Sequence, residues 1–145
     1  MQEYQEARVF HSDRKAMQQV EWLLAKEGIQ KDDNLEYTMG IYSQGELVAT
    51  GSFFKNTLRC LAVDSAYQGE GLLNTVLTHL LHIQFLKGNT KVFLYTKGNK
   101  VRFFADVGFY EIARVEDLVV FMENSATGFR DYLLNLAKKR CRPHL

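Results

Sequence analysis

A glycine-containing stretch at residues 63–77, VDSAYQGEGLLNTVL, has the residue types and spacing best suited to chemistry in this chain. Gly69 and Gly71 lack a β-carbon, so the backbone can turn tightly and an anion can approach its N–H groups closely. Apolar residues after Gly71 recur at helical spacing, which predicts a helix that begins in this turn. Because the first N–H groups of a helix are unpaired, the turn is a candidate phosphate site. The same pattern also occurs in turns that bind no ligand.

The elements that position this turn are predicted from periodicity and turn residues. Before it we expect a helix over 13–26, capped by Ser12 or Asp13, and antiparallel strands over 35–42, 47–54 and 58–63. After it we expect a helix over 72–86, a strand over 91–96 that is buried on both faces, and a short helix over 99–107. A hairpin of 109–113 and 118–122 and a helix capped by Ser125 and running to 139 complete the chain. The strand–helix–strand order over 58–96 predicts a parallel pair of strands.

Composition limits the class of protein. A chain of 145 residues with 46% hydrophobic residues is the size of one domain, so we expect a single domain over 1–145. The net charge of +1 argues against a nucleic-acid partner, and the basic run KKRCR at 138–142 is expected to be a solvated helix end. The sequence has two cysteines, no hydrophobic leader and no long apolar run. It therefore predicts a soluble, cytoplasmic protein that does not enter a membrane.

Other residues suggest chemistry less strongly. His79 and His82 lie three residues apart on the predicted helix, but no third ligand is evident, so we expect an exposed helix face and no metal. Asp64 and Glu70 flank the glycine turn and have the chemistry of bases, although loop and first-turn carboxylates explain them more simply. Cys60 is expected to pack in its strand. The pair Phe103 and Phe104, with Phe109, Tyr110 and Phe121, is expected to belong to the core rather than to a nucleobase platform.

The element order resembles the GCN5-related N-acetyltransferase (GNAT) family over nearly the whole chain. That resemblance implies an α+β acyl-CoA N-acyltransferase fold. Its mixed, mostly antiparallel sheet would have six to seven strands, with a parallel pair at the centre and helices on both faces. The family motif R/Q-x-x-G-x-G/A opens the central helix, and its backbone amides hold the pyrophosphate of acetyl-CoA. Here the resemblance assigns that role to Gln68, Gly69, Glu70, Gly71, Leu72 and Leu73. It further implies that Leu61, Ala62 and Val63 offer backbone groups to the pantetheine arm.

Three positions depart from the family pattern. Leu73 replaces the small residue that usually ends the motif. Phe104 occupies the position of the tyrosine that commonly protonates the departing thiolate, and phenylalanine has no proton to give. Lys97 replaces an asparagine that often contacts pantetheine, and we expect its charge to reach a phosphate. No complete independent active site is evident, so no catalytic residue is assigned and enzymatic activity is left open.

Four short segments resemble the N-terminal domain of citrate lyase ligases: RCLAV at 59–63, QGEGL at 68–72, LYTK at 94–97 and FMENSAT at 121–127. In that family, ATP and acetate are used to acetylate the thiol of a dephospho-CoA-like prosthetic group on the acyl carrier subunit of citrate lyase. A downstream nucleotidyltransferase-like domain with an H-x-G-H type motif performs the ATP chemistry, and this chain has no such motif. The resemblance implies a core over 1–124, and a helix and basic tail over 125–141 that lead to such a domain.

Three functions remain open on the sequence. The first is a domain that binds the arm of CoA, acetyl-CoA or a dephospho-CoA-like group for a citrate lyase ligase, with the acyl carrier subunit as partner. The second is a free-standing acetyltransferase that transfers acetyl from acetyl-CoA to an amine. The third is a non-catalytic module that binds another protein. The sequence does not decide among acceptors, acyl groups or oligomeric states.

Overall fold

The computed structural model describes residues 3–140 and divides into two compact units. The first unit extends to Ile83 and the second begins at Gln84. The boundary falls inside the helix α2 (Leu72–Leu86), most of which belongs to the first unit. Each unit contains strands and helices, and the two are described in turn.

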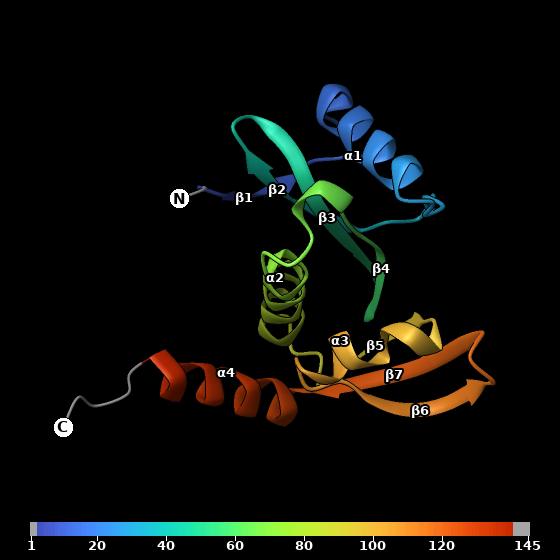
Figure 1. Cartoon of the computed structure of the whole chain (residues 1–145), viewed down its shortest axis with the longest axis vertical. Helices are drawn as coiled ribbons and strands as arrows, with labels where there is room; N and C mark the ends of the chain where they lie inside the picture. The colour runs from blue at the N-terminus through green and yellow to red at the C-terminus, as the bar shows by residue number, and fades with distance from the viewer. Residues whose placement is uncertain (1–2, 141–145) are drawn as a thin grey trace. The chain divides into compact units, whose positions relative to one another are not determined.

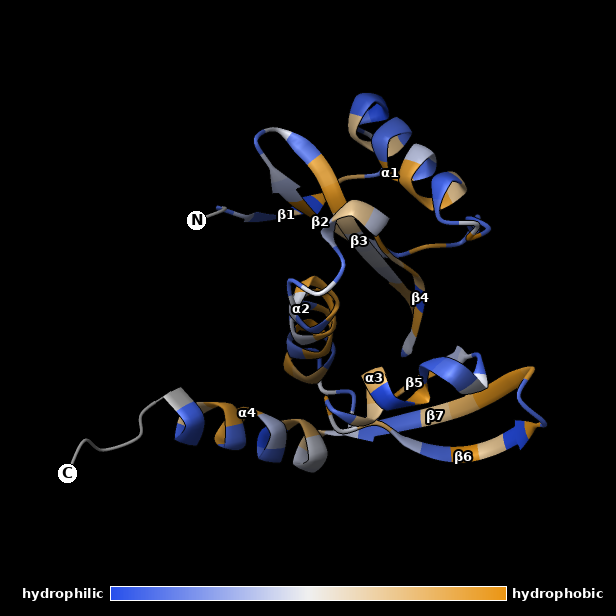
Figure 2. Ribbon diagram, in the orientation of Figure 1, coloured by the Kyte–Doolittle hydropathy of each residue, from blue (hydrophilic) through white to orange (hydrophobic). Residues whose placement is uncertain are grey.

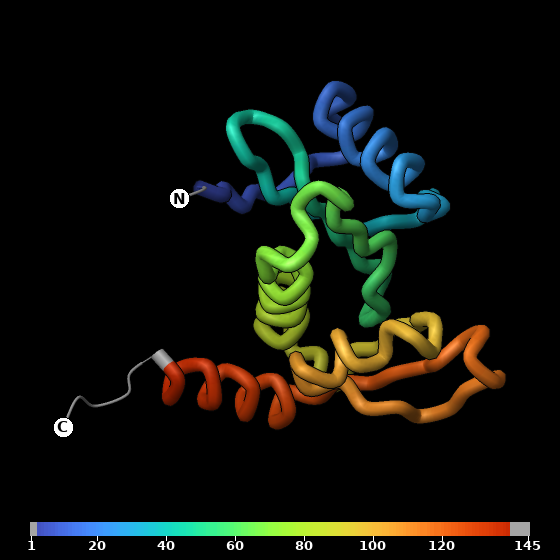
Figure 3. The backbone as a smooth tube through the Cα atoms, viewed as in Figure 1, coloured from blue at the N-terminus to red at the C-terminus, as the bar shows by residue number. Residues whose placement is uncertain are grey.

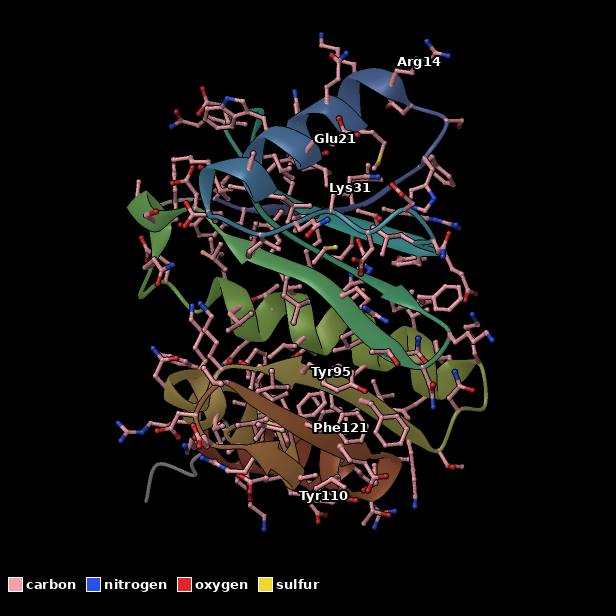
Figure 4. The ribbon with its side chains drawn as sticks, turned by 90° about the vertical axis from the view of Figure 1, so that its right-hand side faces the viewer. Arg14, Glu21, Lys31, Tyr95, Tyr110 and Phe121 are labelled. Atoms are coloured by element: carbon pink, nitrogen blue, oxygen red, sulfur yellow. The ribbon has the colours of Figure 1, made fainter. Side chains whose placement is uncertain are left out.

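The first unit contains four strands in the order β1-β2-β3-β4, and each neighbouring pair is antiparallel. The strands are β1 (Gln5–Val9), β2 (Tyr37–Ser43), β3 (Glu46–Phe54) and β4 (Thr57–Val63). Helix α1 (Arg14–Lys26) and helix α2 cover opposite faces of this sheet (Figures 1 and 4). The predicted meander over β2, β3 and β4 is confirmed.

Helix α1 begins and packs as its sequence predicts. The side chain of Asp13 accepts a hydrogen bond from the N–H of Ala16 at 3.1 Å, so Asp13 is the N-cap. Val20, Leu23 and Leu24 are buried and pack with Val9, Leu47 and Ala62 of the sheet. Figure 2 shows the resulting division of α1 into a hydrophobic and a hydrophilic side.

Helix α2 packs closely on the sheet because β3 has a glycine where the two meet. A β-carbon added at Gly51 would lie 2.4 Å from Cγ1 of Val76 and 2.9 Å from a methyl group of Leu80. Val76, Leu77, Leu80 and Leu81 are almost fully buried, as the helical spacing predicts. The start of α2 is thereby fixed against the strands that precede it.

A β-bulge interrupts β4 shortly before its end. Thr50 pairs with Ala62 and Ser52 pairs with Arg59, so Gly51 lies opposite two residues, Cys60 and Leu61. Cys60 adopts a left-handed backbone conformation with φ of +55°. Its Sγ accepts from the N–H of Asp32 at 3.5 Å and donates to the carbonyl of Gln30 at 3.7 Å, and burial raises the pKa of the thiol. Cys60 is thus half-buried at a distorted position of the strand.

The second unit contains three antiparallel strands in the order β5-β7-β6. They are β5 (Lys91–Thr96), β6 (Tyr110–Val115) and β7 (Val119–Ser125). The helices are the 3₁₀ turn η2 (Gly98–Lys100), α3 (Val101–Ala105) and α4 (Ala126–Arg140). The hydroxyl of Ser125 accepts from the N–H of Gly128 at 3.0 Å, so the predicted cap of the last helix is confirmed.

Two expectations about strands are incomplete or wrong. The strand β1 was not among the elements expected from periodicity, because in QEARV only Val9 is buried. The expectation that β5 is buried on both faces is wrong: Val92 and Leu94 are buried, whereas Tyr95 on the other face is 60% exposed. The hairpin of β6 and β7 is longer than expected. Cys141 and the end of the basic run lie outside the described residues.

Candidate functional site

The predicted phosphate turn joins β4 to α2 through the short 3₁₀ helix η1 (Ser65–Tyr67) (Figure 3). Gly69 and Gly71 have φ of +83° and +76°, and no atom lies within 4 Å of a β-carbon built on either residue. Glycine is therefore required by the left-handed backbone conformation and not by crowding. The residues from Gln68 to Gly71 are exposed, so the turn has space for a ligand.

The backbone N–H groups that follow the turn are free of intrahelical partners. The first bond of α2 runs from the N–H of Thr75 to the carbonyl of Gly71 at 3.2 Å. The N–H groups of Leu72, Leu73 and Asn74 precede it, so the helix offers them no carbonyl one turn earlier. They lie at the positive end of the helix dipole, where an oxyanion is stabilised. The Leu72 side chain is buried, and that of Leu73 is half-buried.

The side chains near the turn supply no positive charge from this part of the sequence. No lysine or arginine occurs between Arg59 and Lys87, and the turn itself contains the exposed Glu70. Partial desolvation and the Glu70 carboxylate raise the pKa of Tyr4, whose ring meets that of Tyr67 edge-on at 6.4 Å. This segment itself therefore offers an anion backbone N–H groups and no Lys or Arg side chain.

The end of α1 fixes the segment that leads into the turn. The carboxylate of Asp64 accepts from Nζ of Lys26 at 2.8 Å and from the N–H of Ala66 at 2.9 Å, and these bonds hold the pKa of Asp64 below its usual value. The neighbouring Glu27 carboxylate accepts from the N–H of Ser65 at 3.1 Å and from its hydroxyl at 2.7 Å. We call these two pairs, Lys26–Asp64 and Glu27–Ser65, the clamp. Asp64 is thus engaged as a loop residue, the simpler of the two interpretations of this carboxylate.

The residues predicted to contact pantetheine lie immediately before the clamp. Ala62 is buried and pairs with Thr50, and Val63 pairs with Ala49. Leu61 belongs to the bulge, where the regular ladder with β3 is interrupted. The amide of Gln68 donates to the carbonyl of Val63 at 3.5 Å, which links the motif glutamine to the end of β4. The structure therefore brings these three residues and the turn together in one unit.

Lys97 and Phe104 belong to the second unit. Lys97 is exposed and lines a hollow of about 360 Å³ with Gly98, Asn99 and Asp117. Phe104 is buried, and its ring meets the ring of Phe109 edge-on at 6.2 Å. Phe104 therefore belongs to the core, as expected, whereas its neighbour Phe103 is 53% exposed and does not.

The two histidines of α2 differ in their surroundings. His82 is exposed as expected, but the expectation is wrong for His79. Nε2 of His79 lies 2.8 Å from the Tyr37 hydroxyl and its Nδ1 lies 3.1 Å from Glu6. Within residues 3–140, no group of three or more His, Cys, Asp or Glu side chains is arranged to hold a metal ion. In the same part of the chain, no helix has the length and hydrophobicity to cross a membrane.

A second hollow, of about 340 Å³, lies beside α1 and contains no residue predicted from the sequence. Arg14 and Glu21 on the helix and Lys31 on the following loop are among its lining residues (Figure 4). The lining carries both signs of charge. It therefore shows no preference for an anion such as a phosphate.

Sequence reasoning missed the residues that hold the turn in place. In the sequence, Lys26 and Glu27 indicate only the end of a predicted helix. In the structure, each contacts a residue 38 positions away. Tyr4 lies in a segment with no predicted element. No local pattern indicates such pairs, because they depend on how α1 packs on the sheet.

Comparison with known proteins gives the family. The model of the Acetyltransferase (GNAT) family matches residues 1–109. The chain is 31% identical over 133 residues to a [citrate [pro-3S]-lyase] ligase of Escherichia coli K12, which covers 92% of this chain and 38% of that protein. A protein of the same name from Klebsiella pneumoniae is 32% identical over 128 residues and covers 88% of this chain and 37% of the relative. The chain thus spans less than two fifths of the length of these curated relatives.

Solved structures show the same fold. An acyl-CoA N-acyltransferase from Pseudomonas aeruginosa superposes with a TM-score of 0.71 at 15% identity and covers 85% of this chain and 100% of that one. The N-acyl amino acid synthase FeeM from uncultured soil microbes gives 0.72 at 13% identity, with 94% and 99% covered. These structures confirm the predicted acyl-CoA N-acyltransferase fold. With three quarters of its length matched by the family model, the chain belongs to the GNAT acetyltransferase family.

Proposed function

We propose that this GNAT domain binds the pyrophosphate–pantetheine arm of a CoA-like group. In this proposal it presents the thiol of that arm to an ATP-dependent ligase of the kind named in the curated relatives. The acceptor is the dephospho-CoA-like prosthetic group on the acyl carrier subunit of citrate lyase. The observation that carries the proposal is the open glycine turn with unpaired N–H groups at the start of α2.

The chemistry of the turn supports the binding step. A pyrophosphate offers several oxygens, and successive N–H groups at a helix start match such an acceptor. We assign the pyrophosphate to the backbone of residues Gln68 to Leu73, and the pantetheine to the backbone of Leu61, Ala62 and Val63. Lys97 is assigned a contact with a phosphate. Acetyl-CoA and CoA carry the same arm as the prosthetic group, so all three ligands suit this site.

Two further observations favour binding over independent catalysis. Phe104 stands at the position of the usual proton donor and is buried against Phe109, so the chain lacks that donor at its usual place. The curated relatives that cover most of this chain are ligases by name. A domain that positions a thiol while another part of the ligase activates acetate accounts for both observations.

Titration of the ¹⁵N-labelled chain with dephospho-CoA tests the binding step. We expect chemical-shift changes at Gly69, Gly71, Leu72 and Leu73, with Asn74 also affected. CoA, which has an additional 3′-phosphate, should produce changes at the same residues. The absence of any change in this segment at millimolar ligand would disprove the proposal.

A second candidate is an acetyltransferase that acts on a small amine, and the family match over residues 1–109 favours it. This reaction would use acetyl-CoA as donor and release the free thiol of CoA. Incubation with acetyl-CoA and a panel of amines, with thiol release as the readout, separates the two functions. The arm-binding proposal predicts binding of acetyl-CoA without amine-dependent release of thiol.

A further inference from the structure

The three strands of the second unit, β5, β7 and β6, have one face that is buried and one that is exposed. Val92, Leu94, Val120 and Met122 point to the buried face. On the exposed face, the strand register aligns Tyr95 with Phe121 and Val115 with Val119. We call this surface the aromatic face, and its members are Phe93, Tyr95, Tyr110, Val115, Val119 and Phe121. Figure 4 shows its three labelled residues, Tyr95, Phe121 and Tyr110, on three successive strands.

The aromatic side chains of this face are ordered against one another. The rings of Phe93 and Phe121 stack with 5.2 Å between centroids, and Tyr95 meets Phe121 at 4.7 Å. Large fractions of the outer members remain accessible: 60% of Tyr95, 46% of Tyr110, 64% of Val115 and 44% of Val119. A continuous apolar surface of this kind is typical of a site that binds another protein.

The aromatic face carries no uncompensated charge near its centre. Glu123 lies on it between Tyr110 and Phe93, and its side chain is only 9% exposed. The Tyr110 hydroxyl donates to this carboxylate, and Nζ of Lys91 lies 3.7 Å from it. A partner therefore meets a neutral surface, and a strongly charged partner would gain nothing at its centre.

We propose that the aromatic face binds the same face of a second copy of this chain. Two neutral, apolar faces are self-complementary, so a two-fold axis can relate them without bringing like charges together. Two sheets that pack face to face lie about 10 Å apart and interdigitate such side chains. The accessible side chains would bury about 500 Å² on each copy, or about 1,000 Å² in total, which is the lower limit of a specific interface. The dimer is accordingly weak and depends on protein concentration.

Sedimentation equilibrium of the full chain from about 1 μM to about 1 mM measures this association. We expect the average mass to rise toward that of a dimer within this range. The variants Tyr95→Lys and Val115→Lys each place a charge on the aromatic face and should raise the dissociation constant at least about tenfold. Both side chains are exposed, so neither substitution disturbs the core.

Phe103→Lys provides the matched control, because Phe103 is 53% exposed and lies on α3 of the same unit. This variant should dimerise like the wild type. Dilution of the labelled wild-type chain should also shift the signals of Tyr95, Val119 and Phe121. The proposal is overturned if the wild type stays monomeric throughout, if both face variants dimerise normally, or if Phe103→Lys is equally impaired.

Discussion

At the scale of single residues, Gly71 has room for a side chain but not the backbone conformation for one. Its φ is +76°, and no atom lies within 4 Å of an added β-carbon. Gly71→Ala therefore acts through the backbone, at a cost of about 1 kcal/mol, and turns the following N–H groups away from a ligand. We expect it to weaken the binding of dephospho-CoA at least about tenfold in isothermal titration calorimetry.

Gly45 supplies the control for this substitution. It lies in the turn between β2 and β3, has φ of +82°, and also has no atom within 4 Å of an added β-carbon. Gly45→Ala should lose a similar amount of stability and bind dephospho-CoA like the wild type. Equal loss of binding in both variants would mean that the effect comes from reduced stability and not from the phosphate turn.

The lowered pKa of Asp64 predicts that the stability of the fold depends on pH. Its pKa in the folded chain is held below the unfolded value of about 4, chiefly by the hydrogen bond from Lys26 and then by that from the N–H of Ala66. The ionised carboxylate therefore stabilises the fold above that pH, and the contribution is lost as pH falls through the folded pKa. Asp64→Asn should lower the free energy of unfolding by about 1–3 kcal/mol at neutral pH.

Urea unfolding of wild type and Asp64→Asn at several pH values checks this expectation. The difference between the two free energies should be largest near pH 7 and should shrink below about pH 4, where Asp64 of the unfolded chain becomes protonated, until the folded carboxylate is protonated as well. A difference that stays constant down to about pH 3 would contradict the assignment of the effect to the ionised Asp64.

At the scale of elements, the clamp makes the position of the turn depend on α1. Glu27 holds both the N–H and the hydroxyl of Ser65, four residues before Gly69. Glu27→Ala should release this segment, so that amide hydrogens between residues 65 and 72 exchange faster while those of β3 are unchanged. Because a mobile turn must be ordered on binding, dephospho-CoA affinity should fall by about two- to tenfold.

Glu21→Ala is the control for this experiment. Glu21 is an exposed residue of α1, the helix that ends just before Glu27, and its substitution also replaces a glutamate by alanine. It should leave both the exchange near the turn and the affinity unchanged. Faster exchange in Glu21→Ala as well would show that helix charge, and not the clamp, controls the turn.

The elements with a regular apolar pattern were predictable, and those without one were not. In α1 and α2, apolar residues recur with the 3.6-residue period of a helix, and both helices were located to within a residue. The strand β1 presents four exposed residues and one buried one, so it has no alternation to detect, and pairing with β2 alone defines it. The burial of β5 on one face was missed because its outer face is also apolar.

The residues of the candidate site were likewise predictable only in part from the sequence. Gly69 and Gly71 are visible in the sequence because a left-handed backbone restricts residue type. Cys60 has the same kind of conformation without being glycine, so the bulge beside Leu61 left no signal. The clamp arises from contacts across 38 residues, which depend on packing and not on local spacing.

At the scale of the whole chain, the family match and the new surface occupy different parts of the sequence. Residues 1–109 match the family model, and they include every residue assigned to the CoA arm. Most of the aromatic face, on β6 and β7, follows residue 109. The two proposals therefore rest on separate observations, and failure of one leaves the other standing.

The distribution of charge over the whole chain predicts how salt affects binding. The chain has 18 basic and 17 acidic residues, and none of the basic ones lies between Arg59 and Lys87. If backbone N–H groups alone hold the pyrophosphate, little screening is possible, and affinity for dephospho-CoA should fall less than about threefold between about 50 mM and 500 mM NaCl.

Substitution of Lys97 tests whether backbone N–H groups alone hold the pyrophosphate. If Lys97 contacts a phosphate, as assigned above, it adds a charge-assisted interaction that salt weakens, so the wild type should lose affinity more steeply, by about tenfold. Lys97→Met would then bind less tightly at low salt and show the shallower dependence of the backbone-only case. Lys100, an exposed residue of the short 3₁₀ turn that Lys97 precedes, gives the matched control Lys100→Met. Identical salt dependence in the wild type and in Lys97→Met would remove Lys97 from the site and leave the glycine turn to bind the phosphates alone.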